Sequence, residues 1–357
     1  MEGFKIKEVF VEALNIKMDA PFTIATGAKY SIENAVIILR LENGIEGYGE
    51  AAPLEPINGE NQATVLATLN SCKDFLVGKD IFKYREIAQQ LKRVFWAQVT
   101  ARCAIEMALL DCVTKQLDMP LFRYLGGAVN RIETDYTIDI VTPEIAGKRA
   151  IALKNEGYKI IKTKVGKNLV HDLDRILSIK QSAPECEITL DANQGFKAYE
   201  ALHFLEELEK NGIRPILFEQ PVAREDLLGM KHVRDNTSVP IAADESVFTA
   251  ADALNVVRIG CADVINIKTM KSGIIEAMDI ATIARTANIK LMIGCMLESV
   301  LSMTASVHLV AGLGGFTFID LDPHTPSDDE GFTSKHQYKA PAYLLDETVA
   351  GIGVVKL

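Results

Sequence analysis

The sequence lacks the features that mark membrane, disulfide-rich and nucleic-acid-binding proteins. Its 357 residues contain no apolar run of eighteen, and the early segment FKIKEVFVEAL alternates charged with apolar residues, so we expect neither a spanning helix nor a leader. The six cysteines form no C-x-x-C pair, which argues against a zinc knuckle and gives no disulfide framework. Basic residues number 38 against 48 acidic ones, for a net charge of −10, and they form no Lys/Arg stripe. We therefore expect a cytoplasmic protein with no membrane and no nucleic-acid partner.

The first third of the chain combines a strand pattern with a helical one. Apolar and polar residues alternate over 4–13, and the run 35–41 is followed by 45–49 across Asn43-Gly44, which predicts a hairpin. From about 62 to 117 the apolar residues recur at helical spacing. We assign residues 1–125 to a small α+β capping unit.

The rest of the chain repeats one pattern eight times. A short β-rich run ends in polar residues and is followed by an amphipathic helix, and the markers at the run ends are 24 to 29 residues apart. This period predicts an α/β fold, a (β/α)8 TIM-type barrel, over 126–325. A doubly wound open sheet is the alternative, but no G-x-G-x-x-G follows an early strand. Residues 326–357 are too few for a domain, and we expect them to pack back on the capping unit. The eight runs are TDYTIDI, IIKTKV, ITLDAN, ILFEQP, PIAADES, VINIKT, LMIGCMLES and FTFIDLD.

Three acidic residues stand where predicted barrel strands end. Asp191 in TLDANQG, Glu219 in LFEQP and Asp244 in AADES follow apolar residues of three consecutive strands. Functional groups of a barrel sit at this end of its strands, and buried carboxylates are unfavourable when unpaired. Three that converge need a cation, and a hard ion with oxygen ligands and open positions suits Mg²⁺, one per subunit. The alternative is that each carboxylate separately caps a helix or forms an ion pair.

Lysines end two apolar strands on opposite sides of the predicted barrel. Lys162 and Lys164 are two residues apart in IIKTKVG, so they point to the same side, and each is expected to lower the pKa of the other. Lys268 in NIKTMKSG lies four strands further round. A lysine on each face of a metal-bound substrate is what inversion of a stereocentre needs. The alternative for the K-x-K pair is an ordinary solvated strand end.

The motifs K-T-K, D-A-N-Q-G, E-Q-P, A-D-E-S and N-I-K-x-x-K-S-G together resemble the enolase superfamily, in particular the muconate lactonizing enzyme subgroup and its dipeptide epimerases. The resemblance covers nearly the whole chain and implies a capping domain, a barrel and a C-terminal return to the cap. It implies that Asp191, Glu219 and Asp244 bind Mg²⁺. It also implies that Lys164 and Lys268 are the two acid/base groups, in keeping with the lysine base and Mg²⁺ of this superfamily.

The resemblance also indicates the substrate. Asp320 and Asp322 form a D-x-D in FIDLDPH, and the D-x-D of dipeptide epimerases holds the free α-ammonium group of the substrate. The resemblance also implies that Lys162 assists the two acid/base lysines. The resemblance therefore implies Mg²⁺-dependent epimerisation of the C-terminal residue of a dipeptide through an enediolate, by a homo-oligomeric enzyme. The alternative is that the D-x-D caps the next turn. Further residues that we place in or beside the pocket are Thr137, Asp139, Cys295, Met296 and Glu298, with Asn193 and Gln220 orienting carboxylates.

Two capping loops, near 20–30 and 52–61, are expected to set the side-chain preference. Family members that prefer Ala-Glu carry an arginine on the first loop, and Gly27 stands at that place in PFTIATGAKY. We therefore do not expect Ala-Glu to be the preferred substrate, and hydrophobic or cationic side chains stay open. Glu55 and Glu60 on the second loop are interpreted as solvated, with a contact to a cationic substrate side chain as the alternative.

Other reactions of the same subgroup begin with the same proton abstraction. They are muconate cycloisomerisation, o-succinylbenzoate synthesis and racemisation of N-acylated amino acids, and their substrates offer no ammonium group to Asp320 and Asp322. A non-enzymatic barrel that serves as a scaffold or binding protein is expected to lose ligands or bases. This sequence retains all of them.

Overall fold

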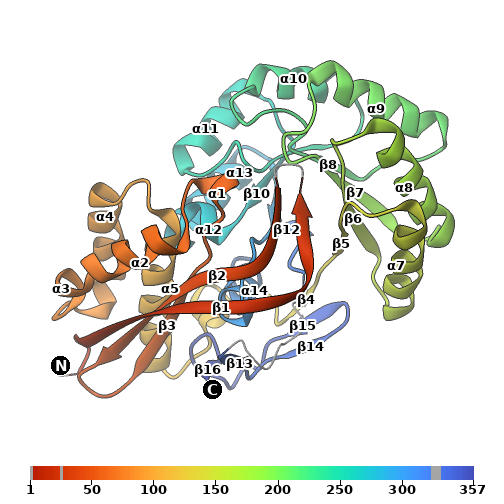
Figure 1. The fold of residues 1–357 in the computed structure, drawn as a ribbon. Helices are drawn as coiled ribbons and strands as arrows, with labels where there is room; N and C mark the ends of the chain where they lie inside the picture. The colour runs from red at the N-terminus through yellow and green to blue at the C-terminus, as the bar shows by residue number, and fades with distance from the viewer. Residues whose placement is uncertain (1–2, 25–26, 323–330) are drawn as a thin grey trace.

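The computed structural model describes residues 3–24, 27–322 and 331–357, with side chains described outside 18–30 (Figure 1). In Figure 1 the red and orange N-terminal part forms one unit beside a larger arc of strands and helices in green and cyan. Within the described residues, no helix is long and apolar enough to cross a membrane. All six cysteines are free thiols.

The N-terminal unit is built on an antiparallel sheet in which the middle strand pairs with both neighbours. Its second hairpin pairs Ala35 with Ala51, and Gly44 in the connecting turn has a φ of 88°. The predicted hairpin is therefore confirmed. The first strand runs well past its predicted end, and the long first hairpin extends toward the barrel in Figure 1. The strands are β1 (Ile6–Ile24), β2 (Gly27–Leu41) and β3 (Glu46–Ala51).

Helix α5 (Val99–Gln116) packs across this sheet and is buried along most of its length. Gly47 and Gly49 of β3 face it: a Cβ at these positions would lie 2.3 Å from the Ala108 carbonyl oxygen and 1.8 Å from that of Ala104. Glycine is therefore required for the two backbones to approach so closely. The predicted helical region is confirmed, as several helices. The other helices of the N-terminal unit are α1 (Glu55–Asn58), α2 (Gln62–Ser71), α3 (Lys73–Leu76), η1 (Ile81–Lys83), α4 (Tyr84–Val94) and α6 (Leu121–Tyr124).

The larger unit is the predicted (β/α)8 barrel. Its eight strands are parallel, and strands that neighbour one another in the sheet also follow one another in sequence. The two edges meet where Asp135 N donates to Ile319 O over 2.9 Å. A doubly wound sheet would reverse its strand order at a switch point, so that alternative is wrong. The strands are β5 (Tyr136–Ile138), β6 (Ile160–Lys164), β7 (Glu187–Asp191), β8 (Leu217–Glu219), β9 (Ile241–Ala243), β10 (Val264–Ile267), β11 (Lys290–Ile293) and β12 (Phe316–Ile319).

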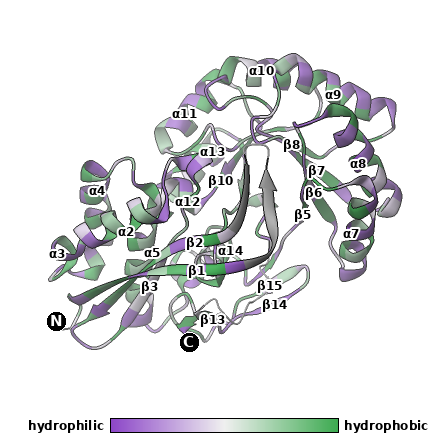
Figure 2. Ribbon diagram, in the orientation of Figure 1, coloured by the Kyte–Doolittle hydropathy of each residue, from purple (hydrophilic) through white to green (hydrophobic). Residues whose placement is uncertain are grey.

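Several helices between the barrel strands begin at a residue whose side chain accepts a hydrogen bond from a free backbone N–H group. Thr142 caps the first of them by accepting from Ile145 N, and Gly157 ends it with a φ of 96°. Figure 2 shows mixed hydrophilic and hydrophobic residues along the outer helices and largely hydrophobic strands inside. The helices are α7 (Pro143–Glu156), α8 (Leu169–Ser182), α9 (Ala198–Lys210), α10 (Leu227–Asp235), α11 (Ala250–Ile259), α12 (Thr269–Ser272), α13 (Ile274–Thr286) and α14 (Val300–Leu313).

Buried carboxylates of the N-terminal unit join it to the barrel. Glu50 of β3 accepts hydrogen bonds from the backbone N–H groups of Ser299 at 2.9 Å and Ser302 at 3.0 Å, at the start of α14. Glu106 of α5 accepts from Ile275 N at 2.9 Å, in the first turn of α13. A helix N-terminus has free N–H groups and a positive dipole end, so a carboxylate is stabilised there. The two units thus dock through helix N-termini.

The C-terminal segment contacts the N-terminal unit and the start of the barrel. Ile352 N donates to Asp111 Oδ1 of α5 over 2.8 Å, and Gly351 O accepts from Leu121 N at 2.9 Å. Its strands form two small antiparallel sheets, one of which includes a strand that precedes the barrel. The strands of these two sheets are β4 (Arg131–Glu133), which precedes the barrel, and β13 (Phe332–Ser334), β14 (Gln337–Lys339), β15 (Ala342–Leu344) and β16 (Val354–Lys356) of the C-terminal segment.

Candidate active site

The carboxyl ends of the barrel strands gather the three acidic residues that the sequence singles out. Asp191 is the last residue of β7, Glu219 is the last residue of β8, and Asp244 directly follows β9. Each of the three is at most 1% exposed. Buried carboxylates need positive charge nearby, and lysines supply it in this structure.

Lys162 and Lys164 of β6 contact these carboxylates from one wall of the barrel. Lys162 Nζ lies 2.7 Å from Glu219 Oε2 and 3.1 Å from Asp191 Oδ2. Lys164 Nζ lies 2.7 Å from Asp191 Oδ2. Both lysines are buried, so the interpretation of the K-x-K pair as a solvated strand end is wrong.

Lys268, which follows β10, contacts the same group of carboxylates from another wall. Its Nζ lies 2.7 Å from Asp244 Oδ2. Strands β6 and β10 are four places apart in a closed sheet of eight, so Lys164 and Lys268 come from opposite sides of the barrel. The structure therefore brings together two ammonium groups on facing walls with carboxylates between them.

The D-x-D residues join this site at the edge between β12 and β5. Asp320 Oδ2 lies 2.6 Å from Lys162 Nζ. Asp322 Oδ1 accepts from Thr137 N at 3.0 Å, and Thr137 Oγ1 approaches Asp320 Oδ1 at 3.5 Å. Lys162 thus connects the D-x-D to Asp191 and Glu219 at the ends of β7 and β8.

The pKa values of these groups follow from burial and from the ion pairs. Burial lowers the pKa of Lys162, but Asp191, Asp320 and Glu219 raise it, and the net pKa is well above its ordinary value. The sequence pattern predicts that Lys164 lowers the pKa of Lys162. The folded chain instead places three carboxylates beside the Lys162 ammonium group, and their charges raise its pKa. Burial, followed by the charge of Asp191, raises the pKa of Glu219 to about 8.

The three carboxylates at the ends of β7, β8 and β9 fit a hard divalent cation, because they offer only oxygen ligands from adjoining strands and are buried. In this structure each of the three forms an ion pair with a lysine ammonium group. Within the described residues, a different acidic trio, Asp135, Asp320 and Asp322, brings one oxygen from each side chain to within 4.8 Å of the other two. The site therefore has two distinct groups of carboxylates.

Comparison with known families identifies the fold. Residues 6–126 match the family described as mandelate racemase / muconate lactonizing enzyme, N-terminal domain, and residues 146–355 match the enolase C-terminal domain-like family. The chain belongs to the enolase superfamily. Its N-terminal match places it with the mandelate racemase and muconate lactonizing enzymes, which confirms the resemblance carried by the motifs.

Similar enolase superfamily proteins span nearly the whole chain. The aromatic dipeptide epimerase of Herpetosiphon aurantiacus is 40% identical over 318 residues, which cover 89% of either chain. The L-Ala-D/L-Glu epimerase of Thermotoga maritima is 36% identical over 94% of this chain and 97% of its own. A crystal structure of the dipeptide epimerase from Enterococcus faecalis V583, complexed with Mg and the dipeptide L-Leu-L-Tyr, is 35% identical. It covers 98% of this chain and 99% of its own, with a TM-score of 0.93.

Two polar residues that the sequence analysis did not assign complete the ion-pair network of this superfamily member. Asn266 of β10 donates from Nδ2 to Glu219 Oε1 at 2.7 Å. Lys271 follows Lys268 by three residues, and its Nζ lies 2.6 Å from Asp244 Oδ1. A signal for both was present: Asn266 interrupts an apolar strand two residues before Lys268, and Lys271 is the second lysine of N-I-K-x-x-K-S-G.

Asn193 and Gln220, which we expected to orient carboxylates, lie in the turns after β7 and β8. Both have positive φ, 40° and 34°. Asn193 holds the carboxylate of Asp191 through its backbone N–H, which donates to Oδ1 at 2.9 Å. Gln220 instead accepts the backbone N–H of Asp244 at 2.9 Å, so it fixes the chain at the end of β9 rather than a carboxylate.

The loop after β11 carries the other predicted pocket residues. Met296 N donates to Glu298 Oε1 at 2.8 Å, and burial raises the pKa of Glu298 to about 7. Cys295 is half-buried. Asn34 of β2 donates to Leu297 O at 2.9 Å, so the N-terminal unit holds this loop in place.

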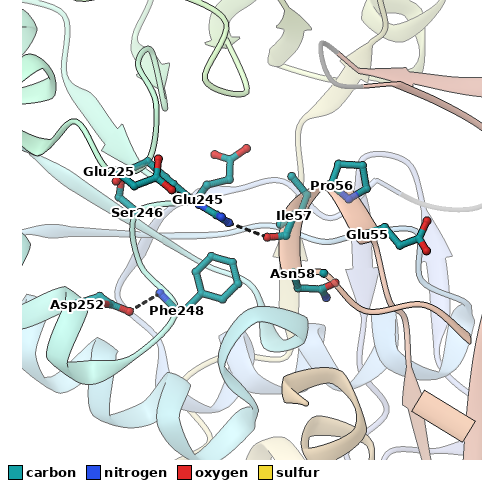
Figure 3. Close-up of a pocket in the computed structure, with 11 residues that line it drawn as sticks. Glu55, Pro56, Ile57, Asn58, Glu225, Glu245, Ser246, Phe248 and Asp252 are labelled. Atoms are coloured by element: carbon teal, nitrogen blue, oxygen red, sulfur yellow. Dashed lines mark hydrogen bonds and ion pairs between the residues drawn. The ribbon is translucent and has the colours of Figure 1, made fainter. Parts of the chain in front are cut away.

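The second capping loop separates its two glutamates. Glu60 is buried and accepts from Thr100 N at 3.1 Å in the first turn of α5, so the solvated interpretation is wrong for Glu60. Glu55 is exposed, as expected, and lines a cavity of about 470 Å³ between α1 and the loops after β8 and β9 (Figure 3). Arg224 spans from the barrel to α1, where its Nη1 donates to Ile57 O at 3.1 Å.

Two further predicted positions stand apart from these contacts. Gly27 is the first residue of β2, and the side chains around it, 18–30, lie outside the described residues. Asp139 follows β5 and is half-buried, and burial raises its pKa.

Proposed function

We propose that this enolase superfamily member is a Mg²⁺-dependent dipeptide epimerase that inverts the C-terminal residue of its substrate. The observation that carries the proposal is the pair of buried lysines on opposite walls, Lys164 and Lys268, with carboxylates between them. The dipeptide epimerases that are 35% to 40% identical over most of the chain support it.

The two ends of a dipeptide carry opposite charges, and the proposed site matches both. Asp191, Glu219 and Asp244 hold one Mg²⁺, which supplies positive charge beside the substrate carboxylate when bound. Asp320 and Asp322 accept hydrogen bonds from the α-ammonium group. Binding at both ends places the α-carbon of the C-terminal residue between the two walls of the barrel.

Proton transfer in the proposed reaction belongs to the facing lysines. The neutral amine of Lys164 or Lys268 takes the α-proton on its own side, and the ammonium group of the other returns a proton to the opposite side, which inverts the centre. Each lysine first leaves the carboxylate that it contacts in this structure. Lys162 stays charged between Glu219 and Asp320, where it stabilises negative charge that develops on the substrate carboxylate.

Racemisation of an N-acylated amino acid is the competing reaction, because it uses the same two lysines. Such a substrate has no α-ammonium group, so Asp320 and Asp322 favour a dipeptide. We further propose a C-terminal side chain other than glutamate, because Gly27 replaces the arginine of members that prefer Ala-Glu.

A library of L-Ala-L-Xaa dipeptides in D₂O tests the function. With Mg²⁺ present, mass spectrometry should show one deuterium at the α-carbon of the C-terminal residue, and chiral chromatography should show the D-epimer. A chelator should abolish both signals. N-acetylated copies of the same dipeptides should stay unlabelled. Labelling of the N-acetylated set alone would contradict the proposal and favour racemisation.

A further inference from the structure

A third acidic side chain lies beside the D-x-D. Asp135 directly precedes β5, and one of its carboxylate oxygens lies within 4.8 Å of oxygens from both Asp320 and Asp322. Asp135 is 4% exposed, and its Oδ1 has no hydrogen-bond partner within the described residues. A buried carboxylate oxygen without a donor is unfavourable, so a bound group that donates a hydrogen bond there is stabilised.

The trio of Asp135, Asp320 and Asp322 has little positive charge beside it. Within the part of the chain that the structure describes, Lys162 is the one basic side chain that forms an ion pair with any of the three, at 2.6 Å from Asp320. Burial, followed by the charge of Asp320, raises the pKa of Asp322 to about 7 and that of Asp135 well above its ordinary value. The trio is therefore a place where a further cation lowers the energy of the ionised carboxylates.

The spacing of the trio suits a primary ammonium group. Such a group has three N–H donors in tetrahedral directions. Three acceptors, each about 2.8 Å from the nitrogen in those directions, are about 4.6 Å from one another. One oxygen from each of the three residues lies within 4.8 Å of one oxygen from each of the other two, a limit that accommodates this spacing. The residues flank β12 and β5, the two strands at which the barrel closes.

We propose that Asp135 is the third acceptor of the ammonium site, so that the site binds all three N–H groups of a primary ammonium and discriminates against N-alkylated substrates. This rests on the proposed dipeptide epimerase function and adds a specificity-determining residue to it. Asp320 and Asp322 supply two acceptors from the chain after β12, and Asp135 supplies the third from just before the neighbouring strand β5.

The test compares two forms of one substrate, the L-Ala-L-Xaa dipeptide that ranks first in the D₂O screen and its N-methyl derivative. The N-methyl form keeps the positive charge but has only two N–H donors. The unmodified protein should show kcat/KM at least about 10-fold lower for the N-methyl form. Asp135→Asn keeps the shape and removes the charge, and it should raise KM for the primary form by roughly 10- to 100-fold and reduce the discrimination.

The ratio of the two substrates is measured on one preparation, so a partly unfolded variant does not change it. Asp263→Asn is the matched control: Asp263 also precedes a barrel strand, but it pairs with Arg234 at 2.8 Å and should keep the normal ratio.

Three outcomes overturn the assignment. The first is an active protein that accepts both substrate forms equally. The second is an Asp135→Asn variant with unchanged KM and an unchanged ratio, which is also what purely steric exclusion of the methyl group predicts. Both leave the proposed function intact. The third is a protein that labels no dipeptide, which contradicts the proposed function itself.

Discussion

Buried carboxylates occur in two regions of this protein with different partners. In the barrel, Asp191 and Asp244 contact the ammonium groups of Lys164 and Lys268 at 2.7 Å. At the joint between the two units, Glu50 accepts hydrogen bonds from the backbone at the start of α14. A lysine side chain can rotate away from its partner, whereas a helix N-terminus cannot. The barrel contacts are therefore suited to exchange during a reaction, and the joint contacts are suited to hold the fold.

The largest expected effect comes from breaking the barrel contacts. Lys164→Ala and Lys268→Ala should each lower kcat by about 10²- to 10⁴-fold, because each removes a group that transfers a proton in the proposed reaction. The fold should persist, because the carboxylates keep a second lysine, Lys162 or Lys271, within 3.1 Å. Epimerisation rates and thermal unfolding by circular dichroism check this, with Lys159→Ala, exposed just before β6, as the control. A variant that loses cooperative unfolding would show that the lysine is mainly structural.

Breaking the contacts at the joint should lower the stability of the fold, whereas breaking the barrel contacts should lower activity. Glu50→Ala removes the acceptor of several buried donors and should lower the free energy of unfolding by about 3 kcal/mol or more. Glu50→Gln keeps the shape and should cost less. Urea unfolding measures both. A loss below about 1 kcal/mol in Glu50→Ala would contradict the role of the joint.

Glu106, which forms the second contact at the joint, should make the stability of the fold depend on pH. Burial raises the pKa of Glu106 to about 7, from an ordinary value of 4.5. The folded protein therefore binds this proton more tightly, so the contribution to stability is present below pH 4.5 and is lost as the pH rises through about 7. It amounts to at most about 3 kcal/mol.

Urea unfolding of Glu106→Gln across this pH range should show a flatter stability curve than the unmodified protein. Glu144→Gln, at an exposed position, is the control and should keep the slope. An unchanged slope in Glu106→Gln would assign the pH dependence to other groups.

The smallest effect is expected at the capping loop. Arg224 is partly exposed and joins the barrel to α1 by a single hydrogen bond to Ile57 O. Arg224→Ala should raise KM by roughly two- to tenfold with kcat unchanged, because one such bond contributes about 0.5–1.5 kcal/mol. Steady-state kinetics checks this. A fall in kcat without a change in KM would place Arg224 in the chemical step instead.

The barrel and the facing ionic groups could be predicted from the sequence because both are local patterns. Lys164 and Asp191 each end an apolar run, and the repeat period fixes which strands face one another. The joint could not be predicted, because Glu50 and Ser299 are 249 residues apart in sequence. Glu60 follows a turn and therefore resembles a solvated residue until α5 packs beside it.

The pKa of Lys162 was predicted in the wrong direction for a related reason. The sequence shows Lys164 as its charged neighbour, but the folded chain places carboxylates from β7, β8 and the end of β12 around the ammonium group. Opposite charges at 2.6 to 3.1 Å outweigh the like charge that shares the strand.

Proton exchange in D₂O with single-lysine variants tests the central claim most directly. Each epimer of the dipeptide is incubated separately with Lys164→Ala and with Lys268→Ala, and α-deuterium is measured by mass spectrometry. If the lysines serve opposite faces, each variant should label one epimer only, and the two variants should label different epimers. Labelling of the same epimer by both variants, or full epimerisation by either, would contradict the account.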